Sequence, residues 1–587
     1  MKRYLLLLTF LLSHALISQA QSIHQEEYLR YKQAGISAEE YERINQAAHV
    51  TDARGGSNCN LNKIVFGWHP YWQNGYESNY QWDLLSHLCY FSYDVNYLNG
   101  NALTTNSWSS ANVVTQALAN NVKVSLCVTL FDDHAAFFGN STAKQTLITN
   151  LISLVQSRGA HGVNIDFEAV PSGQSANLTA FMLDLCSQFH TAIPNGEVSI
   201  ALPSVDWSNT FDVAAMSGCV DQFFIMGYDY YYGGSAQAGP TDPLYSLVST
   251  YNYNHAKSIT YYLNRGVAAN KLCLGLPYYG REWETESNTV PSNTTGSYSG
   301  TRYYNYVRNN SGTYSNHQYH AGSKSGYFTY QNGGNWRQCF INSAYTLGKR
   351  FEMVNMRGLA GIGIWALGYD DGYLDFWNQI EEKFTDCYAP ACNDTLYDMG
   401  GPSQNYYDNE NYTYTISPAN ASTIDLSFFS FSTEANYDTL WLYNGSSTAA
   451  PLIGAYTGTN SPGNFTTSTG SLTLRFKSDV STNSFGFRAY YYCNQIVTGE
   501  NNEWTIENGQ LKVYPNPAED ILTIECSAEI KEVRIYDATG RLVASPLSPV
   551  RGEKKTVDVS QLSSGIYNIC VFTDEGILTK KIIIAGN

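Results

Sequence analysis

The sequence predicts an α/β protein, a (β/α)8 barrel followed by two all-β sandwich domains. Between residues 59 and 386, short apolar strands alternate with helical patterns, as they do in a parallel α/β fold. In residues 387–493 the helical periodicity disappears, and short strands alternate with turns rich in Gly, Asn and Ser. Residues 512–587 form a further β-rich unit, and a length of 587 residues allows several domains.

Eight predicted strands make up the barrel. They are Lys63–Trp68, His87–Tyr93, Val122–Thr129, Gly162–Glu168, Val198–Pro203, Gln222–Tyr228, Leu272–Pro277 and Gly361–Ala366. An insertion rich in Ser, Asn, Gly and Tyr is expected at about residues 284–335, between the seventh and eighth strands. Catalytic groups of such barrels stand at the carboxyl ends of the strands.

The fourth strand carries the most informative segment, the octapeptide from His161 to Glu168. Side chains alternate along a strand, so Asn164, Asp166 and Glu168 share one face, about 6–7 Å apart in backbone spacing. The apolar residues between them face the opposite layer. An acidic strand end beside a loop is the ordinary alternative, but a glutamate at this end of a barrel strand indicates acid-base chemistry.

The first 58 residues are predicted to lie outside the barrel. Lys2 and Arg3 precede the apolar run Leu5–Leu12, and Ser18-Gln19-Ala20 is a small-residue cleavage site, so residues 1–20 are predicted to be a signal peptide. The apolar run is too short for a transmembrane helix, and no later one suffices. Residues 21–58 are predicted to be a polar helical pro-segment or spacer that packs on the next domain, with no evident chemistry.

Composition excludes some classes of partner. The net charge of −17 and the absence of a basic stripe argue against nucleic acid and anionic membranes. Twelve cysteines are a modest number for an exported chain of this length, and none has zinc-site spacing. Cys89, Cys127 and Cys273 are expected to be buried thiols, while Cys392 and Cys493 bracket a β-rich segment that they could bridge.

The octapeptide resembles the active-site strand of glycoside hydrolase family 18, whose pattern is Asp-Gly-x-Asp-x-Asp-x-Glu. Gly162, Asp166 and Glu168 match it, whereas His161 departs from it. Asn164 replaces a carboxylate by an amide, as in the branch that resembles spore-germination and peptidoglycan-active members. The third strand, Ser125–Phe131, lacks the Ser-x-Gly-Gly of many family chitinases and also favours that branch.

The resemblance implies substrate-assisted hydrolysis, in which the 2-acetamido oxygen of the sugar attacks the anomeric carbon and no cofactor takes part. Glu168 is then the general acid and base. Asp166 is expected to hold the acetamido N–H and to raise the pKa of Glu168 by like-charge repulsion. Asn164 is expected to be a hydrogen-bond partner of Asp166.

Further segments match family motifs in the expected order. Phe223–Asp229 resembles the Met-x-Tyr-Asp motif, which implies that Tyr228 donates to the acetamido oxygen, Asp229 contacts the same sugar and Met226 lines the pocket floor. The resemblance also implies that Trp365 lies beneath the sugar, that Tyr278 and Arg281 face the cleft, and that the insertion forms one cleft wall.

The remaining domains resemble two other families. Residues 387–493 resemble a CUB domain through Tyr437–Gly445 and Phe476–Asp479. Positions that hold calcium in some members are matched by Glu434, Asp438 and Asp479, although solvated acidic loops are an equal alternative. A polar linker is expected at residues 494–511. The motifs Val513–Ala518, Ile535–Arg541 and Asp558–Tyr567 then follow in order. Through them, residues 512–587 resemble the C-terminal sorting domain of the type IX secretion system of Bacteroidetes.

These resemblances predict a secreted or cell-surface hydrolase of β-1,4-linked N-acetylglucosamine glycans, exported through the periplasm with the type IX machinery as a partner. Chitin and chito-oligosaccharides are the first choice, and peptidoglycan and N-glycans are alternatives. A different class is a non-catalytic sugar-binding protein, against which Glu168 argues because family lectins usually lose this glutamate. Another is an adhesin that binds through the CUB-like domain.

Overall fold

The computed structural model describes residues 22–45, 59–495 and 511–585, the last range with gaps at 527–529, 538–541, 545–553, 564 and 574–576. The chain divides into two compact units, residues 1–496 and 497–587. The predicted signal peptide and most of the predicted linker lie outside the described residues. Among the residues described, no helix combines the length and apolar character needed to cross a membrane.

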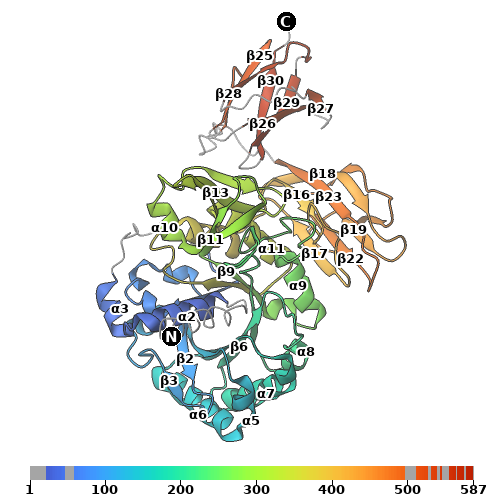
Figure 1. Cartoon of the computed structure of the whole chain (residues 1–587). Coiled ribbons are helices and arrows are strands. Elements are labelled where there is room, and N and C mark those ends of the chain that lie inside the picture. The colour runs from blue at the N-terminus through green and yellow to red at the C-terminus, as the bar shows by residue number, and fades with distance from the viewer. Residues whose placement is uncertain are drawn as a thin grey trace, which may run out of the picture. The chain divides into compact units, whose positions relative to one another are not determined.

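Eight parallel strands form a closed barrel, as predicted (Figure 1). The first strand pairs with both the second and the eighth, which closes the ring. In chain order they are β1 (Ile64–Pro70), β2 (His87–Val95), β4 (Lys123–Leu130), β5 (Gly162–Phe167), β6 (Glu197–Pro203), β7 (Gln222–Met226), β9 (Leu272–Pro277) and β15 (Gly361–Trp365). The short antiparallel β3 (Ala102–Thr104) extends the sheet beside β2.

Closure brings backbones close together at the strand starts. A Cβ at Gly361 would lie 1.9 Å from the carbonyl oxygen of Ile64, so only glycine allows β15 to pair with β1 there. The same holds at Gly162, where a Cβ would lie 2.5 Å from the carbonyl oxygen of Glu197. The first residue of the octapeptide strand is therefore fixed by packing.

Helices surround the barrel. They are α4 (Asn112–Ala119), α5 (His134–Gly139), α6 (Ser141–Arg158), α7 (Ser175–Ala192), α8 (Val213–Met216), α9 (His255–Asn264), α11 (Ala344–Met356) and α12 (Asp375–Phe384). In α6, Asn140 caps the first turn and Gly159 ends the helix with φ 62°. Leu147, Leu151 and Val155 recur at helical spacing on its buried face.

The insertion between β9 and β15 runs over residues 279–340, wider than the predicted 284–335. It is an antiparallel sheet with one helix, α10 (Tyr304–Asn309). Its strands are β10 (Tyr279–Thr285), β11 (Ser292–Tyr303), β12 (His317–His320), β13 (Ser325–Asn332) and β14 (Asn335–Phe340), with β8 (Gln237–Ala238) added at one edge.

The CUB-like region consists of two antiparallel sheets, and the Cys392–Cys493 disulfide joins its ends. One sheet contains β16 (Asn393–Tyr397), β18 (Ala421–Ser432), β21 (Asn464–Thr466) and β23 (Gly486–Gln495). The other contains β17 (Asn411–Ile416), β19 (Thr439–Tyr443), β20 (Leu452–Tyr456) and β22 (Leu472–Lys477). Lys349 on α11 forms an ion pair of 2.8 Å with Asp394, which links this region to the barrel.

The second unit is also all-β and has its own core of Leu, Ile and Val side chains. A three-stranded sheet contains β24 (Leu511–Tyr514), β25 (Ile521–Cys526) and β28 (Lys554–Asp558). A four-stranded sheet contains β26 (Ile530–Asp537), β27 (Leu542–Ala544), β29 (Gly565–Thr573) and β30 (Ile577–Ile584).

A second disulfide, Cys59–Cys387, fastens the start of the barrel to its end. Beside it, the backbone N–H of Asn60 donates to Asp386 at 2.9 Å, and the backbone N–H of Asn62 donates to the carbonyl of Phe384 at 2.9 Å. The sequence alone does not predict this bridge, because its cysteines are 328 residues apart. The predicted thiols Cys89, Cys127 and Cys273 are buried and free.

Two helices precede the barrel, α2 (Ile23–Ala34) and α3 (Ala38–Ile44). Ser22 caps α2 by accepting from the backbone N–H of Gln25, and Gly35 ends it with φ 67°. Both helices pack on the barrel (Figure 1), and their contacts are those of the site below.

We predict that Arg350→Met lowers the free energy of unfolding by about 3–5 kcal/mol, because it leaves a buried carboxylate unpaired. Arg350 on α11 is fully buried, and its Nε donates to Asp242 Oδ2 at 2.9 Å. Its Nη2 also donates to Ser325 Oγ at the start of β13, at 3.2 Å, which ties the insertion to the barrel.

Urea unfolding measures the loss. Arg43→Met is the control, because Arg43 pairs with Glu40 on an exposed helix surface, where solvent screening leaves a salt bridge little effect on stability. Equal stability of the two variants would contradict the prediction.

Candidate active site

Three barrel strands bring the expected acid-base residues to one place. Asp166 is the penultimate residue of β5 and is 0% exposed, and Glu168 directly follows the strand at 7% exposed. Tyr228 follows β7 and is also buried. Trp365 is the last residue of β15. All four lie at the carboxyl ends of their strands, the catalytic end of a parallel barrel.

These four residues converge on the imidazole ring of His24, from α2. Its Nδ1 lies 2.8 Å from Asp166 Oδ2 and 3.3 Å from Glu168 Oε1. Its Nε2 lies 2.6 Å from the hydroxyl of Tyr228. The ring stacks on the indole of Trp365, with centroids 3.7 Å apart and planes inclined by 28°. An N-terminal side chain therefore fills the space that the sequence assigned to a sugar.

Burial and charge together set the protonation of this cluster. Burial raises the pKa of Glu168, and the neighbouring charge of Asp166 raises it further, while His24 opposes both. Burial alone would lower the pKa of His24, but Asp166 and Glu168 raise it to about 10. At neutral pH the ring is an imidazolium, so Nδ1 donates to Asp166 and Nε2 donates to Tyr228.

Asn164 does not have the partner expected from the sequence. Its Oδ1 accepts from the indole N–H of Trp68 at 3.0 Å, and its Nδ2 donates to Ser199 Oγ at 2.9 Å. None of the hydrogen bonds that the described residues make with Asn164 reaches Asp166. Two residues on the same face of a strand are too far apart for a direct bond, so Asn164 lies one layer deeper in the barrel.

The expectation for Tyr278 is wrong by one residue. Tyr278 is fully buried, and its ring packs against Phe376 of α12, with centroids 4.7 Å apart. Tyr279 faces the site instead, and its hydroxyl donates to Asp229 Oδ1 at 2.9 Å. Tyr279 and Arg281 share one face of β10 by strand alternation, which leaves Tyr278 on the other.

Asp229 and Arg281 hold the first turn of α2. Asp229 Oδ2 accepts from the backbone N–H of Ile23 at 3.0 Å. Arg281 donates through both Nη atoms to Glu26, at 3.2 and 2.8 Å, and its Nη2 lies 3.4 Å from Asp229 Oδ1. Burial raises the pKa of Asp229, and Arg281 opposes that shift.

Glu27, one turn after His24, is also buried in the site. Its Oε2 accepts from the indole N–H of Trp365 at 2.9 Å and from the hydroxyl of Tyr369 at 2.7 Å. Its Oε1 accepts from the hydroxyl of Tyr303 at 2.7 Å. These bonds satisfy the carboxyl with three neutral donors, and burial raises its pKa.

An open cavity of about 290 Å³ remains beside Glu168. Met226 and Asp229 line it together with Trp207, whose side chain is 70% exposed. Ser22 and Gln25 form the wall on the α2 side. The helix therefore covers the Trp365 side of Glu168 and leaves this side accessible.

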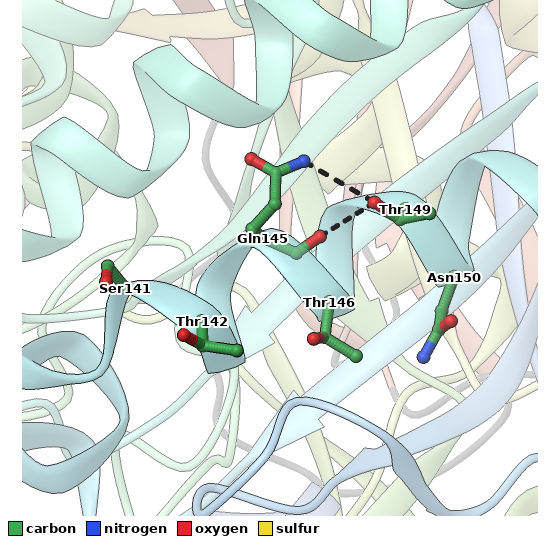
Figure 2. A pocket seen from close by; sticks show the side chains of 6 residues that line it. All are labelled: Ser141, Thr142, Gln145, Thr146, Thr149 and Asn150. Carbon is green, nitrogen blue, oxygen red and sulfur yellow. Dashed lines mark hydrogen bonds between the residues drawn. The ribbon is translucent and has the colours of Figure 1, made fainter.

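A second hollow lies on the barrel surface along α6 (Figure 2). Its lining side chains come from that one helix and carry no ionisable group. They are Ser141, Thr142, Gln145, Thr146, Thr149 and Asn150. Figure 2 shows Gln145 and Thr149 bonded to each other within the helix, so this hollow offers no acid-base chemistry.

The three acidic residues of the candidate calcium site also lie together. Glu434, Asp438 and Asp479 each offer a carboxylate oxygen, and these oxygens lie within 4.8 Å of one another. Asp438 Oδ1 accepts from the backbone N–H of Asp479 at 2.8 Å, and Oδ2 accepts from the hydroxyl of Tyr406. Glu434 Oε2 is buried without a hydrogen-bond partner among the described residues.

Sequence reasoning missed His24, Glu27 and Tyr279. Tyr279 could have been found from strand parity with Arg281. Nothing local identifies His24, since it stands at the start of a polar helix, 142 residues before Asp166. The local signals that could have shown where this helix begins are a Ser cap at position 22 and the acidic pair Glu26–Glu27.

Comparison with known proteins identifies three family models along the chain. Residues 65–370 match glycosyl hydrolases family 18, residues 391–491 match the CUB domain, and residues 512–585 match the secretion system C-terminal sorting domain. The order is the one predicted from the sequence, and the first match covers more than half of the chain.

Among curated relatives, a putative sporulation-specific glycosylase of Bacillus subtilis, YdhD, is 25% identical over 40% of this chain and 53% of its own length. Chitinase C of Streptomyces lividans is 27% identical over 28% of this chain and 27% of its own. The match thus spans about half or less of these relatives. Among solved structures, a Group IV chitinase of Ostrinia furnacalis has 20% identity and a TM-score of 0.49, over 54% of this chain and 98% of that chain.

We predict that docking of α2 weakens as the pH rises from about 6.5 to about 10. With α2 docked, the pKa of His24 is about 10, above its ordinary value of 6.5. The stabilisation of the docked state by protonated His24 is therefore complete below pH 6.5 and is lost as the pH rises through about 10. The facing groups are Asp166, Glu168 and Tyr228. The difference in melting temperature between wild type and His24→Gln should shrink over this range. A constant difference would contradict the charged state of His24.

Proposed function

Because this chain belongs to family 18 of the glycosyl hydrolases, we propose that it hydrolyses β-1,4-linked N-acetylglucosamine glycans, with chitin and chito-oligosaccharides as the first substrates. One observation carries the proposal. The imidazole ring of His24, stacked on Trp365, is within reach of Asp166, Glu168 and Tyr228. Side chains in this arrangement can bind the 2-acetamido group of a sugar and protonate its glycosidic oxygen.

In the proposed reaction, Glu168 gives its proton to the glycosidic oxygen as the bond to the anomeric carbon breaks. The acetamido carbonyl oxygen forms the new bond to that carbon, and an oxazolinium ion results. Asp166 orients the acetamido group, which gives it the high effective concentration of an intramolecular nucleophile. Water then loses a proton to Glu168 and attacks the same carbon, the bond from that carbon to the acetamido oxygen breaks, and the β configuration and the 2-acetamido group are restored.

The environment of Glu168 supports its role as acid. Its raised pKa keeps the proton available closer to neutral pH, the range in which a general acid works best. Asp229 is held by Tyr279 and Arg281, so this carboxylate is unsuited to act as a nucleophile. The open cavity beside Trp207 would receive the leaving part of the glycan, with the exposed indole as a stacking surface.

The glycan strand of peptidoglycan is a second candidate substrate. Asn164, an amide where many chitinases carry a carboxylate, favours it through the resemblance noted above. Mass spectrometry of the products from chitin oligomers and from purified peptidoglycan, under identical conditions, separates the two.

The accessory domains fit an exported enzyme. The C-terminal sorting domain implies export, and we propose the type IX machinery as its reader and the medium or cell surface as its destination. The proposed hydrolysis uses no cofactor. We further propose that the CUB-like domain binds calcium through Glu434, Asp438 and Asp479, since the unpartnered oxygen of Glu434 fits a hard cation.

We predict that Glu168→Gln lowers kcat by about 10²–10⁴-fold, because the amide keeps the shape but cannot give up a proton. Turnover of an N-acetylglucosamine oligomer measures the loss. Asp184→Asn, an exposed change on α7, is the control and should leave kcat unchanged. A Glu168→Gln enzyme with a wild-type rate would refute the role of this residue.

We predict retention of anomeric configuration and dependence on the 2-acetamido group, since the acetamido oxygen is the nucleophile of the proposed reaction. Proton NMR during hydrolysis of a β-linked oligomer should show the β-product first, and de-acetylated oligomers should be poor substrates. A thiazoline analogue of the oxazolinium ion should inhibit. First release of the α-product would exclude this mechanism.

A further inference from the structure

We propose that residues 22–45 are an intramolecular inhibitor that occupies the sugar site and keeps the exported enzyme latent until the segment leaves the cleft. This inference deepens the proposed function and rests on it for the identity of the excluded ligand. Five features carry it: the position, the chemistry and the extent of the docked segment, its dependence on the cleft, and the separate fastening of the barrel.

The position of His24 is that of a reacting sugar. Its ring stacks on Trp365 at 3.7 Å, where the sugar ring is expected. Its Nδ1–H donates to Asp166, the residue expected to accept from an acetamido N–H. Its Nε2 is bonded to Tyr228, the residue expected to hold the acetamido oxygen. A sugar and His24 therefore cannot occupy the site together.

The positive charge of the His24 ring matches the charge that the sugar carries in the transition state of the proposed reaction. Positive charge develops on the sugar as the glycosidic bond breaks, and an enzyme binds that charge more strongly than the neutral substrate. The imidazolium of His24 places a positive, planar group beside Asp166 and Glu168. A charged ring on α2 thus uses the electrostatic interactions that the barrel provides for catalysis.

The docked segment extends well beyond His24. Glu27 accepts a hydrogen bond from the indole N–H of Trp365. Tyr31 stacks on Trp72, which follows β1, with centroids 4.4 Å apart and planes inclined by 10°. Tyr41 on α3 packs edge-on against Tyr71, and Asn45, which follows α3, donates to the carbonyls of Trp72 and Asn74. Aromatic rings that could stack on further sugars are thereby covered.

The helix depends on this docking. An isolated helix of 12 residues is marginal in water, and α2 carries only a narrow apolar surface. Its buried residues are Ile23, His24, Glu27 and Tyr28, so three of the four buried side chains are ionisable. Their burial is favourable only where the cleft supplies partners for both His24 and Glu27.

The start of the barrel is held by contacts that do not involve the segment. Cys59 is tied to Cys387, and Asn60 and Asn62 bond to the end of α12 and the residues that follow it. The barrel is thus fastened at its first described residue, without help from α2 or α3. The segment can leave the cleft while the strand order and the active-site strands remain intact.

The test uses the full chain with His24→Ala, and with Gln33→Ala as the matched control on the exposed side of α2. Because a closed enzyme cannot bind substrate, the apparent KM rises by the reciprocal of the open fraction while kcat at saturation is unaffected. His24→Ala should lower KM for an N-acetylglucosamine oligomer at least about tenfold and leave kcat within about twofold. Gln33→Ala should match wild type.

Hydrogen exchange gives a readout without substrate. The amides of α2 should be protected in wild type and in Gln33→Ala, and should lose protection in His24→Ala. Protection lost without a change in KM would overturn the proposal, as would an unprotected α2 in wild type. If neither wild type nor His24→Ala hydrolyses the oligomer, while the α2 amides still lose protection in His24→Ala, the proposed substrate is wrong. The exchange data alone then support the docking of α2 through His24.

Discussion

The alternation of side chains along β5 is the constraint on which the site depends. Once the barrel closes with Gly162 against the backbone of β6, the pleat decides that Asp166 faces the barrel axis and that Glu168 follows two positions later at the open end. The carboxyl ends of β7 and β15 then bring Tyr228 and Trp365 to the same point. A slip of one residue in β5 would exchange these carboxyl groups for Ile165 and Phe167.

Two carboxyl groups side by side in a buried site repel each other when both are ionised. The cluster reduces this repulsion in two ways. In one, Glu168 keeps its proton because burial and Asp166 raise its pKa. In the other, the imidazolium of His24 compensates the charge. The same local field thus suits a general acid when the cleft is open and binds a cation when α2 is docked.

The sequence predicts the features that depend on local periodicity. The eight barrel strands and the side-by-side placement of Asp166 and Glu168 follow from period-two and period-3.6 patterns. The expectation for Tyr278 was wrong because Tyr278 precedes β10, on which Tyr279 and Arg281 share the face toward the site. The expected partner of Asn164 was wrong because its actual partners, Trp68 and Ser199, come from other strands of the same barrel layer. Contacts of that kind are fixed by closure, which no local pattern records.

The docked helix is the strongest case of that limit, and it also shows what a polar N-terminal segment can encode. His24, Glu26 and Glu27 look like a solvated helix start, because nothing near them in sequence provides their partners. In the folded chain, those three side chains meet Asp166, Arg281 and Trp365, which is a pattern of complementary donors and acceptors. A spacer would need only solubility from these positions. Complementarity to the reacting groups is what a ligand of the cleft requires.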